Sequence, residues 1–172
     1  MAAEPGTYEL LRSTERSAVH LEMRDGYTPD DPDWLDWQAG NRFDPAEREE
    51  WRGWFDLVAA TVARGVIVRR ARIVSEPVSA YIRFEYDVTA GHNLAAGEQV
   101  RWLARRRAPD LVVPVSDFWL FDDRLVVWNH FAGDGSWAAR ELCDDPEVVK
   151  LCSSSFEAVW DRAIPHEEYR SA

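Results

Sequence analysis

The sequence predicts a single α/β domain in which helices flank a mixed sheet. Its 172 residues match the size of one domain. The chain is 46% hydrophobic and 12% aromatic, which is enough to bury a core. Helical and strand patterns also alternate along the chain, as they do in layered α/β folds. We therefore expect one domain over residues 1–172, with residues 1–7 as a flexible tail.

The first half of the chain predicts a strand, two helices and a second strand. Residues 17–24 alternate apolar and polar side chains, as a half-buried strand does. Asp-Pro pairs then begin a short helix over residues 31–40 and a long amphipathic helix over residues 45–63. Gly65 ends the long helix, and the β-branched segment 66–74 predicts a strand directly after it.

The second half predicts a third helix over residues 77–90, then three strands and a last helix. The strands are expected at residues 99–103, 117–121 and 125–131. Asp122 and Asp123 form a tight hairpin turn between the last two strands. The last helix is expected from Asp145 to near Pro165. The resulting order, β-α-α-β-α-β-β-β-α, indicates a mixed sheet.

Charge and hydropathy restrict the partners and the location. The formal net charge of −11 repels phosphate backbones, so direct binding of nucleic acid is disfavoured. Direct DNA binding through Arg101, Arg105, Arg106 and Arg107 is a minor alternative. No apolar run approaches the roughly 18 residues of a membrane span, and the first residues do not resemble a secretory signal. Two isolated cysteines are expected to be free thiols. We expect a cytoplasmic protein with no membrane partner.

Several common catalytic motifs are missing from the sequence. Neither GxxxxGK[ST] nor GxGxxG occurs, so phosphate-cradling loops of those kinds are excluded. The chain has no CxxC pair and no nucleophile elbow of the form GxSxG. We therefore assign no catalytic residue, no cofactor and no metal ligand, and an enzyme is not the leading hypothesis.

The best candidate for a binding site is the segment 69–93, which interleaves charged and aromatic side chains. With two residues from later strands, the candidates are Arg70, Arg72, Glu76, Tyr81, Arg83, Glu85, His92, Asn93, Asp117 and His130. Arginines beside aromatic rings suit an anionic or planar ligand, or an acidic groove on a partner. The alternative is that Arg72, Glu76, Arg83 and Glu85 form salt bridges within the chain.

Tryptophans on the predicted helices leave a similar choice open. Trp34, Trp37, Trp51 and Trp54 have the spacing of core residues. Tryptophan is also enriched at interface hot spots, so an exposed pair would mark a docking patch.

Long blocks of the sequence resemble a known family. The blocks are HLEMRDGYTPDDPDW (20–34), RRARIVSEPVSAYIRFEYDVTAGHNLAAGEQVRWL (69–103), DFWLFDDRLVVWNHFAGDG (117–135) and FEAVWDRAIPHEEY (156–169). They resemble an abundant actinobacterial family of uncharacterised domains, over nearly the whole chain from about residue 8. Members are typically encoded beside small helix-turn-helix regulators. The resemblance therefore implies a protein partner and not a reaction.

A remoter resemblance concerns the fold. The strand pair DFWLFDD…VVWNHF, followed by a helix, is similar to the later part of a phospholipase D-like fold. The catalytic signature of that superfamily is His-x-Lys with an aspartate four residues after the lysine. Ala132 stands two places after His130, and the single lysine, Lys150, has no histidine two places before it. The resemblance therefore implies the fold without its usual activity, as in related ligand-sensing or protein-binding domains.

Together these observations lead to two hypotheses of different classes. The first is a regulatory interaction domain that partners a helix-turn-helix transcriptional regulator and senses a small anionic ligand. A homodimer is left open. The second is an enzyme that acts on a phosphate ester or nucleotide, with His130, Asp117 and arginines in unfamiliar roles.

Overall fold

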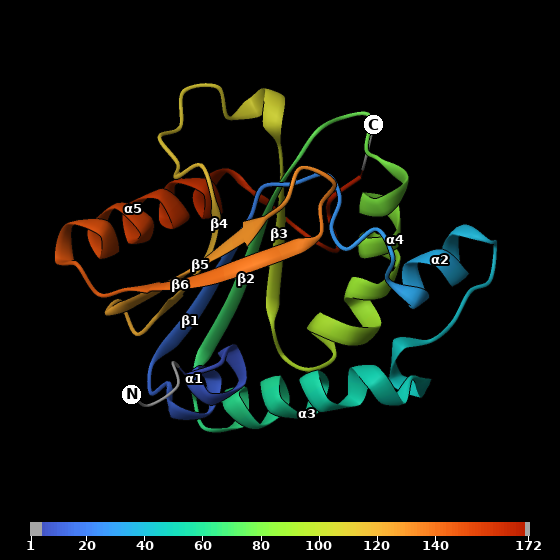
Figure 1. Ribbon diagram of the computed structural model, residues 1–172, viewed down its shortest axis with the longest axis horizontal. Helices are drawn as coiled ribbons and strands as arrows, with labels where there is room; N and C mark the ends of the chain where they lie inside the picture. Colours follow the sequence, from blue (N-terminus) through green and yellow to red (C-terminus); the bar gives the residue numbers. More distant parts are fainter. Residues whose placement is uncertain (1–4, 171–172) are drawn as a thin grey trace.

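Seven strands form one mixed sheet at the centre of the molecule, in the order β6-β5-β4-β1-β2-β3-β7 (Figure 1). The computed structural model describes residues 5–170, except for the side chain of residue 50. The strands are β1 (Ser17–Glu22), β2 (Ile67–Val74), β3 (Gln99–Ala104), β4 (Asp117–Phe121), β5 (Leu125–Phe131), β6 (Trp137–Cys143) and β7 (Ile164–Pro165). β1, β2 and β3 run parallel to one another, and the other neighbouring strands pair in an antiparallel way.

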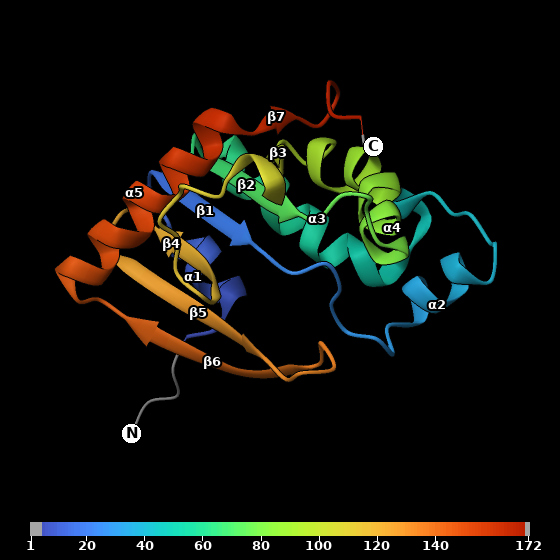
Figure 2. The same cartoon turned by 90° about the horizontal axis from the view of Figure 1, so that it is seen from above.

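Helices cover both faces of the sheet. They are α1 (Thr7–Ser13), α2 (Pro32–Gln38), α3 (Glu49–Ala63), α4 (Ala80–Thr89) and α5 (Pro146–Arg162). In Figure 1, α5 lies on one side of the sheet while α1 and α3 lie on the other. Figure 2 shows α2 and α4 at the end of the molecule opposite α5 and β6. None of the described helices is long and apolar enough to cross a membrane.

Successive side chains of each strand point to opposite faces of the sheet, so the molecule has a separate apolar core on each face. Val19 and Leu21 of β1 point toward α5, where they pack with Phe156. Ala18 points to the opposite face and packs with Val58 of α3. The same alternation turns His20 and Glu22 toward the α3 face, beyond the end of its apolar core. That end of the face is therefore polar.

The helix expected over residues 45–63 is interrupted, and this prediction was wrong at its start. Asp44 caps only a single 3-10 turn, Pro45–Glu47, and α3 begins at Glu49. Between them Arg48 is extended, with φ −89° and ψ 117°. Its guanidinium binds Asp36 at 2.7 Å and lies over the ring of Phe43, so tertiary contacts hold the break.

The helix expected over residues 77–90 is shifted toward the C-terminus. Ser79 caps α4 through a hydrogen bond from the backbone N–H of Ile82, so the helix begins later than Pro77 predicted. Gly91 does not end it, because a π-helical turn continues through Ala90–Leu94. A side chain at Gly91 would meet Pro45 at 3.3 Å, so this glycine serves close packing between segments.

The hairpin formed by β4 and β5 agrees with the sequence prediction, whereas the last helix ends earlier than predicted. Residues 117–121 and 125–131 are strands, and Asp122 and Asp123 have φ values of 52° and 53°, as the predicted turn requires. The last helix ends at Arg162, because the chain turns to pair β7 with β3.

Three elements were not predicted: α1, β6 and β7. Thr7 begins α1, so it is not part of a tail, and residues 1–4 of the expected tail lie outside the described residues. Both cysteines are free thiols, as expected.

Candidate ligand-binding site

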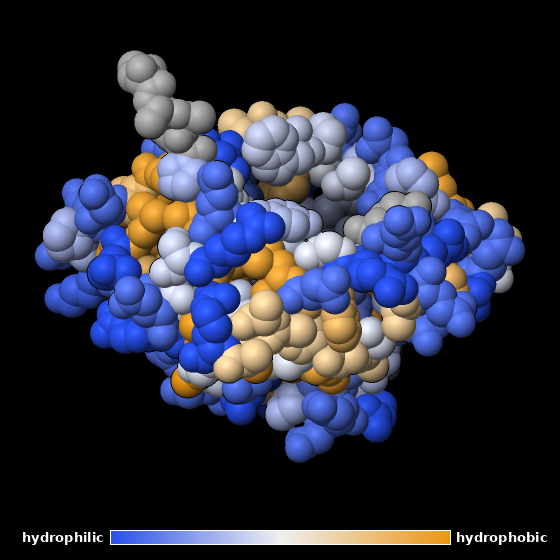
Figure 3. Space-filling view, turned by 90° about the horizontal axis from the view of Figure 1, so that it is seen from below, coloured by the Kyte–Doolittle hydropathy of each residue, from blue (hydrophilic) through white to orange (hydrophobic). Residues whose placement is uncertain are grey.

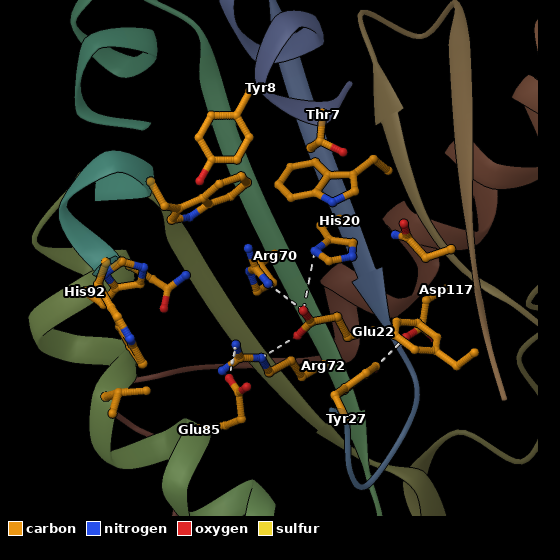
Figure 4. A pocket seen from close by; sticks show the side chains of 17 residues that line it. Thr7, Tyr8, His20, Glu22, Tyr27, Arg70, Arg72, Glu85, His92 and Asp117 are labelled. Atoms are coloured by element: carbon orange, nitrogen blue, oxygen red, sulfur yellow. Dashed lines mark hydrogen bonds and ion pairs between the residues drawn. The ribbon is translucent and has the colours of Figure 1, made fainter. Parts of the chain in front are cut away.

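A pocket of about 470 Å³ lies over β1, β2, β4 and β5, on the face of the sheet that carries α1, α3 and α4 (Figure 4). The polar residues at its floor come from β1 and β2 and from the start of β4. Ligands of open α/β sheets commonly bind near the carboxyl ends of parallel strands. The size is typical of pockets for small molecules.

Two neighbouring parallel strands build the charged floor. His20 pairs in register with Arg70, and Glu22 with Arg72, so four polar side chains meet on one face. Glu22 lies at the centre and accepts a hydrogen bond from Arg70 Nη1 at 2.5 Å and from Arg72 Nε at 2.6 Å. Burial raises the pKa of Glu22, but the two guanidiniums outweigh it and hold the pKa well below its usual range.

Further acceptors engage both guanidiniums. Arg70 Nε donates to Glu98 Oε1 at 2.7 Å, and Glu98 is almost completely buried. Arg72 Nη2 lies 2.5 Å from Glu85 Oε2, and Arg72 Nη1 donates to Thr89 at 2.8 Å. Each arginine therefore has two carboxylate partners, which compensates for the cost of burying its charge.

Two histidines of the pocket are neutral at neutral pH. Burial lowers the pKa of His20 to about 3, and it lowers that of His92 to about 4. The His20 ring stacks on Trp119 with centroids 4.3 Å apart. Its Nδ1 atom is buried without a hydrogen bond, although Glu22 Oε1 lies 3.4 Å away. The proton of the neutral ring is therefore expected on Nδ1, directed toward the Glu22 carboxylate, with the lone pair on Nε2.

Asp117 adds a carboxyl group with altered acidity. It accepts hydrogen bonds from Tyr27 Oη at 2.5 Å and from the backbone N–H of Met23 at 2.9 Å. Burial raises the pKa of Asp117 to about 6, and the nearby charge of Glu22 acts in the same direction. The group therefore changes its protonation in a pH range where most carboxylates stay ionised.

Aromatic rings form the walls above this floor. They are Tyr8, Tyr27, Trp51, Trp54, Trp119 and Phe131. Trp54 packs edge-on against both Tyr8 and Trp119, at centroid distances of 5.6 and 5.9 Å. Apolar walls with a few polar groups at the floor are the usual arrangement of a small-molecule site.

The structure brings together six of the ten candidate residues. Arg70, Arg72, Glu85, His92, Asn93 and Asp117 line the pocket. Tyr81 borders it and donates a hydrogen bond to Glu85 at 2.9 Å. Whether these residues bind a ligand stays a prediction.

The other three candidates lie elsewhere. Glu76 binds Arg106 and Tyr169, and Arg83 lines a separate hollow. His130 follows the pocket residue Asn129 on β5, so its side chain points to the opposite face, where it contacts Glu141 at 3.2 Å. Of the salt bridges proposed within this group, Arg72 with Glu85 is present at 2.5 Å.

The sequence interpretation missed His20, Glu22 and Tyr27. The signal for the first two was present: in a strand with apolar residues at 19 and 21, residues 20 and 22 share the other face. The tryptophans have mixed roles, since Trp34 is buried while Trp51 and Trp54 line the pocket. Within residues 5–170, no group of three His, Cys, Asp or Glu side chains could hold a metal ion.

Comparisons with known proteins give a family and a fold. The family described as "Domain of unknown function (DUF6879)" matches residues 6–171. No curated protein matches the sequence. A phospholipase D family member, Nuc from Salmonella typhimurium, is 13% identical with a TM-score of 0.50, over 95% of this chain and 88% of that one. This similarity confirms the predicted phospholipase D-like α/β fold and says nothing further.

A second solved structure is similar over part of its length. It is TrmBL2, an archaeal chromatin protein described as showing a novel mode of DNA binding, with 14% identity and a TM-score of 0.49. The match covers 91% of this chain and 48% of that one, so the chain spans about half the length of TrmBL2.

Proposed function

The chain belongs to the DUF6879 family of domains of unknown function, and we propose that it is a regulatory module that senses a small molecule in the pocket over β1 and β2. The observation that carries this proposal is the pocket itself. Its floor is an ordered network of buried charges, and its walls are aromatic. Fixed polar groups of this kind give orientation and specificity to a bound ligand.

The network is costly for a purely structural element. Burying an ion pair offers little net stability compared with apolar packing, because both charges lose water. Arg70 and Arg72 are only 7% and 4% exposed, yet they form part of the floor of an open pocket. Retaining two buried arginines there supports a role in positioning a ligand.

The partner of this module is proposed to be a helix-turn-helix regulator. The support is the resemblance to domains encoded beside such regulators. Val112, Val115 and Trp137 are exposed apolar side chains that a partner could cover. Figure 3 views the side of the molecule that carries α1 and α3, where further apolar areas lie among hydrophilic side chains. The cytoplasmic location expected from the sequence belongs to this proposal.

The enzymatic alternative has weaker support. It combined His130 with Asp117, but these side chains point to opposite faces of the sheet. A general acid–base pair has to reach one substrate within hydrogen-bond distance. Turnover of a phosphate ester abolished by His130→Ala, in a folded protein, would restore this alternative.

The test of sensing compares two variants of β5. Asn129→Phe fills the pocket, while His130→Phe adds the same ring to the opposite face of the strand and serves as the control. The purified chain is incubated with a cell extract, washed, and analysed by mass spectrometry for retained small molecules. We expect the same molecule on wild type and His130→Phe and none on Asn129→Phe.

A bound ligand should also raise the melting temperature, by an amount that grows with its concentration. Retention of no small molecule, or equal retention by Asn129→Phe, would contradict the sensing function. For the partner, the tagged chain should retain a helix-turn-helix protein in near-stoichiometric amount from its native lysate. Recovery of the chain without such a protein would contradict that part of the proposal.

A further inference from the structure

We infer that the ligand of this pocket is a small organic cation, a protonated amine attached to a planar ring. The inference rests on the proposed sensing function and names its substrate class. It differs from the anionic ligand expected from the sequence, because the sequence could not show how the arginines are paired. Three independent features of the pocket support it: its charge balance, its aromatic walls and a histidine nitrogen that can accept a hydrogen bond.

Carboxylates outnumber cations at the floor. Among the lining residues, Arg70 and Arg72 face the three carboxylates of Glu22, Glu85 and Asp117, and Glu98, which is outside the lining, pairs with Arg70. Arg24 lies outside the lining and donates to the carbonyl oxygen of Ala132 at 3.3 Å. When both outer residues, Glu98 and Arg24, are counted, three cations stand against four carboxylates. A ligand with one positive charge would balance this excess, and an anion would increase it.

Five of the six side-chain nitrogens of Arg70 and Arg72 are already occupied. Arg70 donates through Nε and Nη1 to carboxylates, and Arg72 uses Nε, Nη1 and Nη2 for contacts with Glu22, Thr89 and Glu85. Among the described residues Arg70 Nη2 has no such contact, but an anion bound at any of the other nitrogens would have to displace a buried carboxylate or the Thr89 hydroxyl. The displaced carboxylate would then remain buried without its partner, which is strongly unfavourable.

The aromatic walls of the pocket favour a cation over an anion. The face of an aromatic ring carries partial negative charge and attracts cations. Arg70 lies 5.5 Å from the centroid of Trp119, so this ring already has a cation. Among the described residues, no guanidinium lies over Trp51 or Trp54, both of which line the pocket. These two rings are therefore available to a ligand cation.

A hydrogen-bond acceptor completes the site. His20 lines the pocket, and its buried Nδ1 atom lies 3.4 Å from Glu22 Oε1. In Figure 4 the His20 ring lies between Glu22 and the aromatic wall. Because Glu22 is ionised, the neutral ring carries its proton on Nδ1, directed toward this carboxylate, and Nε2 is the acceptor of an N–H donor. A ligand ammonium or ring N–H would supply that donor.

The test uses three probes that share one ring and differ in charge: tryptamine, indole and indole-3-acetate. Each is titrated into the full chain by isothermal titration calorimetry. We expect saturable binding of tryptamine, with a dissociation constant about tenfold below that of indole-3-acetate. Indole should fall between them, because it keeps the ring contacts without the charge.

Two matched variants locate the effect. Asp117→Asn removes a pocket charge without changing the size of the side chain, and it should weaken tryptamine binding several-fold while leaving indole unchanged. Asp123→Asn makes the same chemical change on the exposed hairpin turn and should leave all three affinities unchanged. Circular dichroism confirms that both variants fold. Equal loss of tryptamine binding in both variants would overturn the assignment to this pocket.

Two outcomes overturn the inference itself. One is binding of indole-3-acetate as tightly as tryptamine, which would leave the sensing function standing and change only the charge of its ligand. The other is the absence of saturable tryptamine binding. Failure of the sensing function is seen separately, as retention of no small molecule from the cell extract.

Discussion

Removal of Arg70 should destabilise the fold strongly, because it leaves a carboxylate buried without its partner. Arg70 is 7% exposed and Glu98 is 2% exposed, with 2.7 Å between Arg70 Nε and Glu98 Oε1. In Arg70→Met, Glu22 keeps Arg72, but Glu98 keeps only the amide of Asn93 as a side-chain partner. Breaking a buried pair in this way costs about 3–5 kcal/mol. For a domain of this size that corresponds to a fall in Tm of roughly 6–20 °C.

A double-mutant cycle with a second substitution at Glu98 tests whether the unpaired carboxylate causes this loss of stability. Glu98→Gln in the Arg70→Met background removes the unpaired charge, so the double variant should regain about 2 kcal/mol relative to Arg70→Met. The control is Arg69→Met on the opposite face of β2, whose partner Glu157 is half exposed, and about 1 kcal/mol is expected there.

Urea unfolding followed by circular dichroism measures the free energy of unfolding of each variant, provided that the slopes agree. The reasoning would be refuted if the losses in free energy of unfolding caused by Arg70→Met and Glu98→Gln simply added in the double variant. A loss below about 1 kcal/mol for Arg70→Met would refute it as well. Either result would mean that water reaches Glu98 and solvates its charge in the folded state.

Three further predictions use the same unfolding assay. Trp160→Ala should cost about 3–5 kcal/mol, because Trp160 is a buried aromatic in the core under α5; an unchanged curve would show that the site tolerates the cavity. Asp122→Ala should cost roughly 1–3 kcal/mol, since its carboxylate accepts the backbone N–H groups of Arg16 and Ser17 at 2.7 and 3.0 Å. Burial raises the pKa of Asp122, but these bonds lower it below its usual value, so the difference from wild type should shrink as pH falls below about 4. For Asp117 the sign is reversed: its pKa of about 6 in the folded state lies above that in the unfolded chain, so ionisation costs wild-type stability as pH rises from about 4 to 6. Asp117→Asn should lack this loss, and identical pH profiles would argue against a buried carboxylate there.

Local signals in the sequence were sufficient where one segment decides its own structure. Asp31 accepts the backbone N–H groups of Asp33 and Trp34, as a capping residue at the start of the expected short helix should. The Asp122-Asp123 hairpin follows from the tolerance of aspartate for positive φ. The pocket residues from segment 69–93 were found because charged and aromatic side chains alternate there. His20 and Glu22 were missed although strand alternation places them on one face, because the residues they contact, Trp119 and Arg70, are distant in the sequence.

Errors in the expected elements arose where distant segments act. The break at Arg48 depends on Asp36, and Gly91 lies inside a helical turn, where it packs closely against Pro45, instead of ending the helix. β6 consists mostly of exposed residues, so its hydropathy pattern carries little strand signal. β7 is two residues long and exists only because β3 offers it an edge.

The sequence by itself determined the fold class, most of the strands and helices, and the absence of the common catalytic motifs. These depend on periodicity, capping and residue identity, which are local properties. The tertiary structure alone decided that Glu22 and Glu98 occupy Arg70, and that Glu85 reaches Arg72 from α4. The charge that a pocket offers to a ligand depends on which of its ions are already paired, and that pairing is set by strand register and helix position.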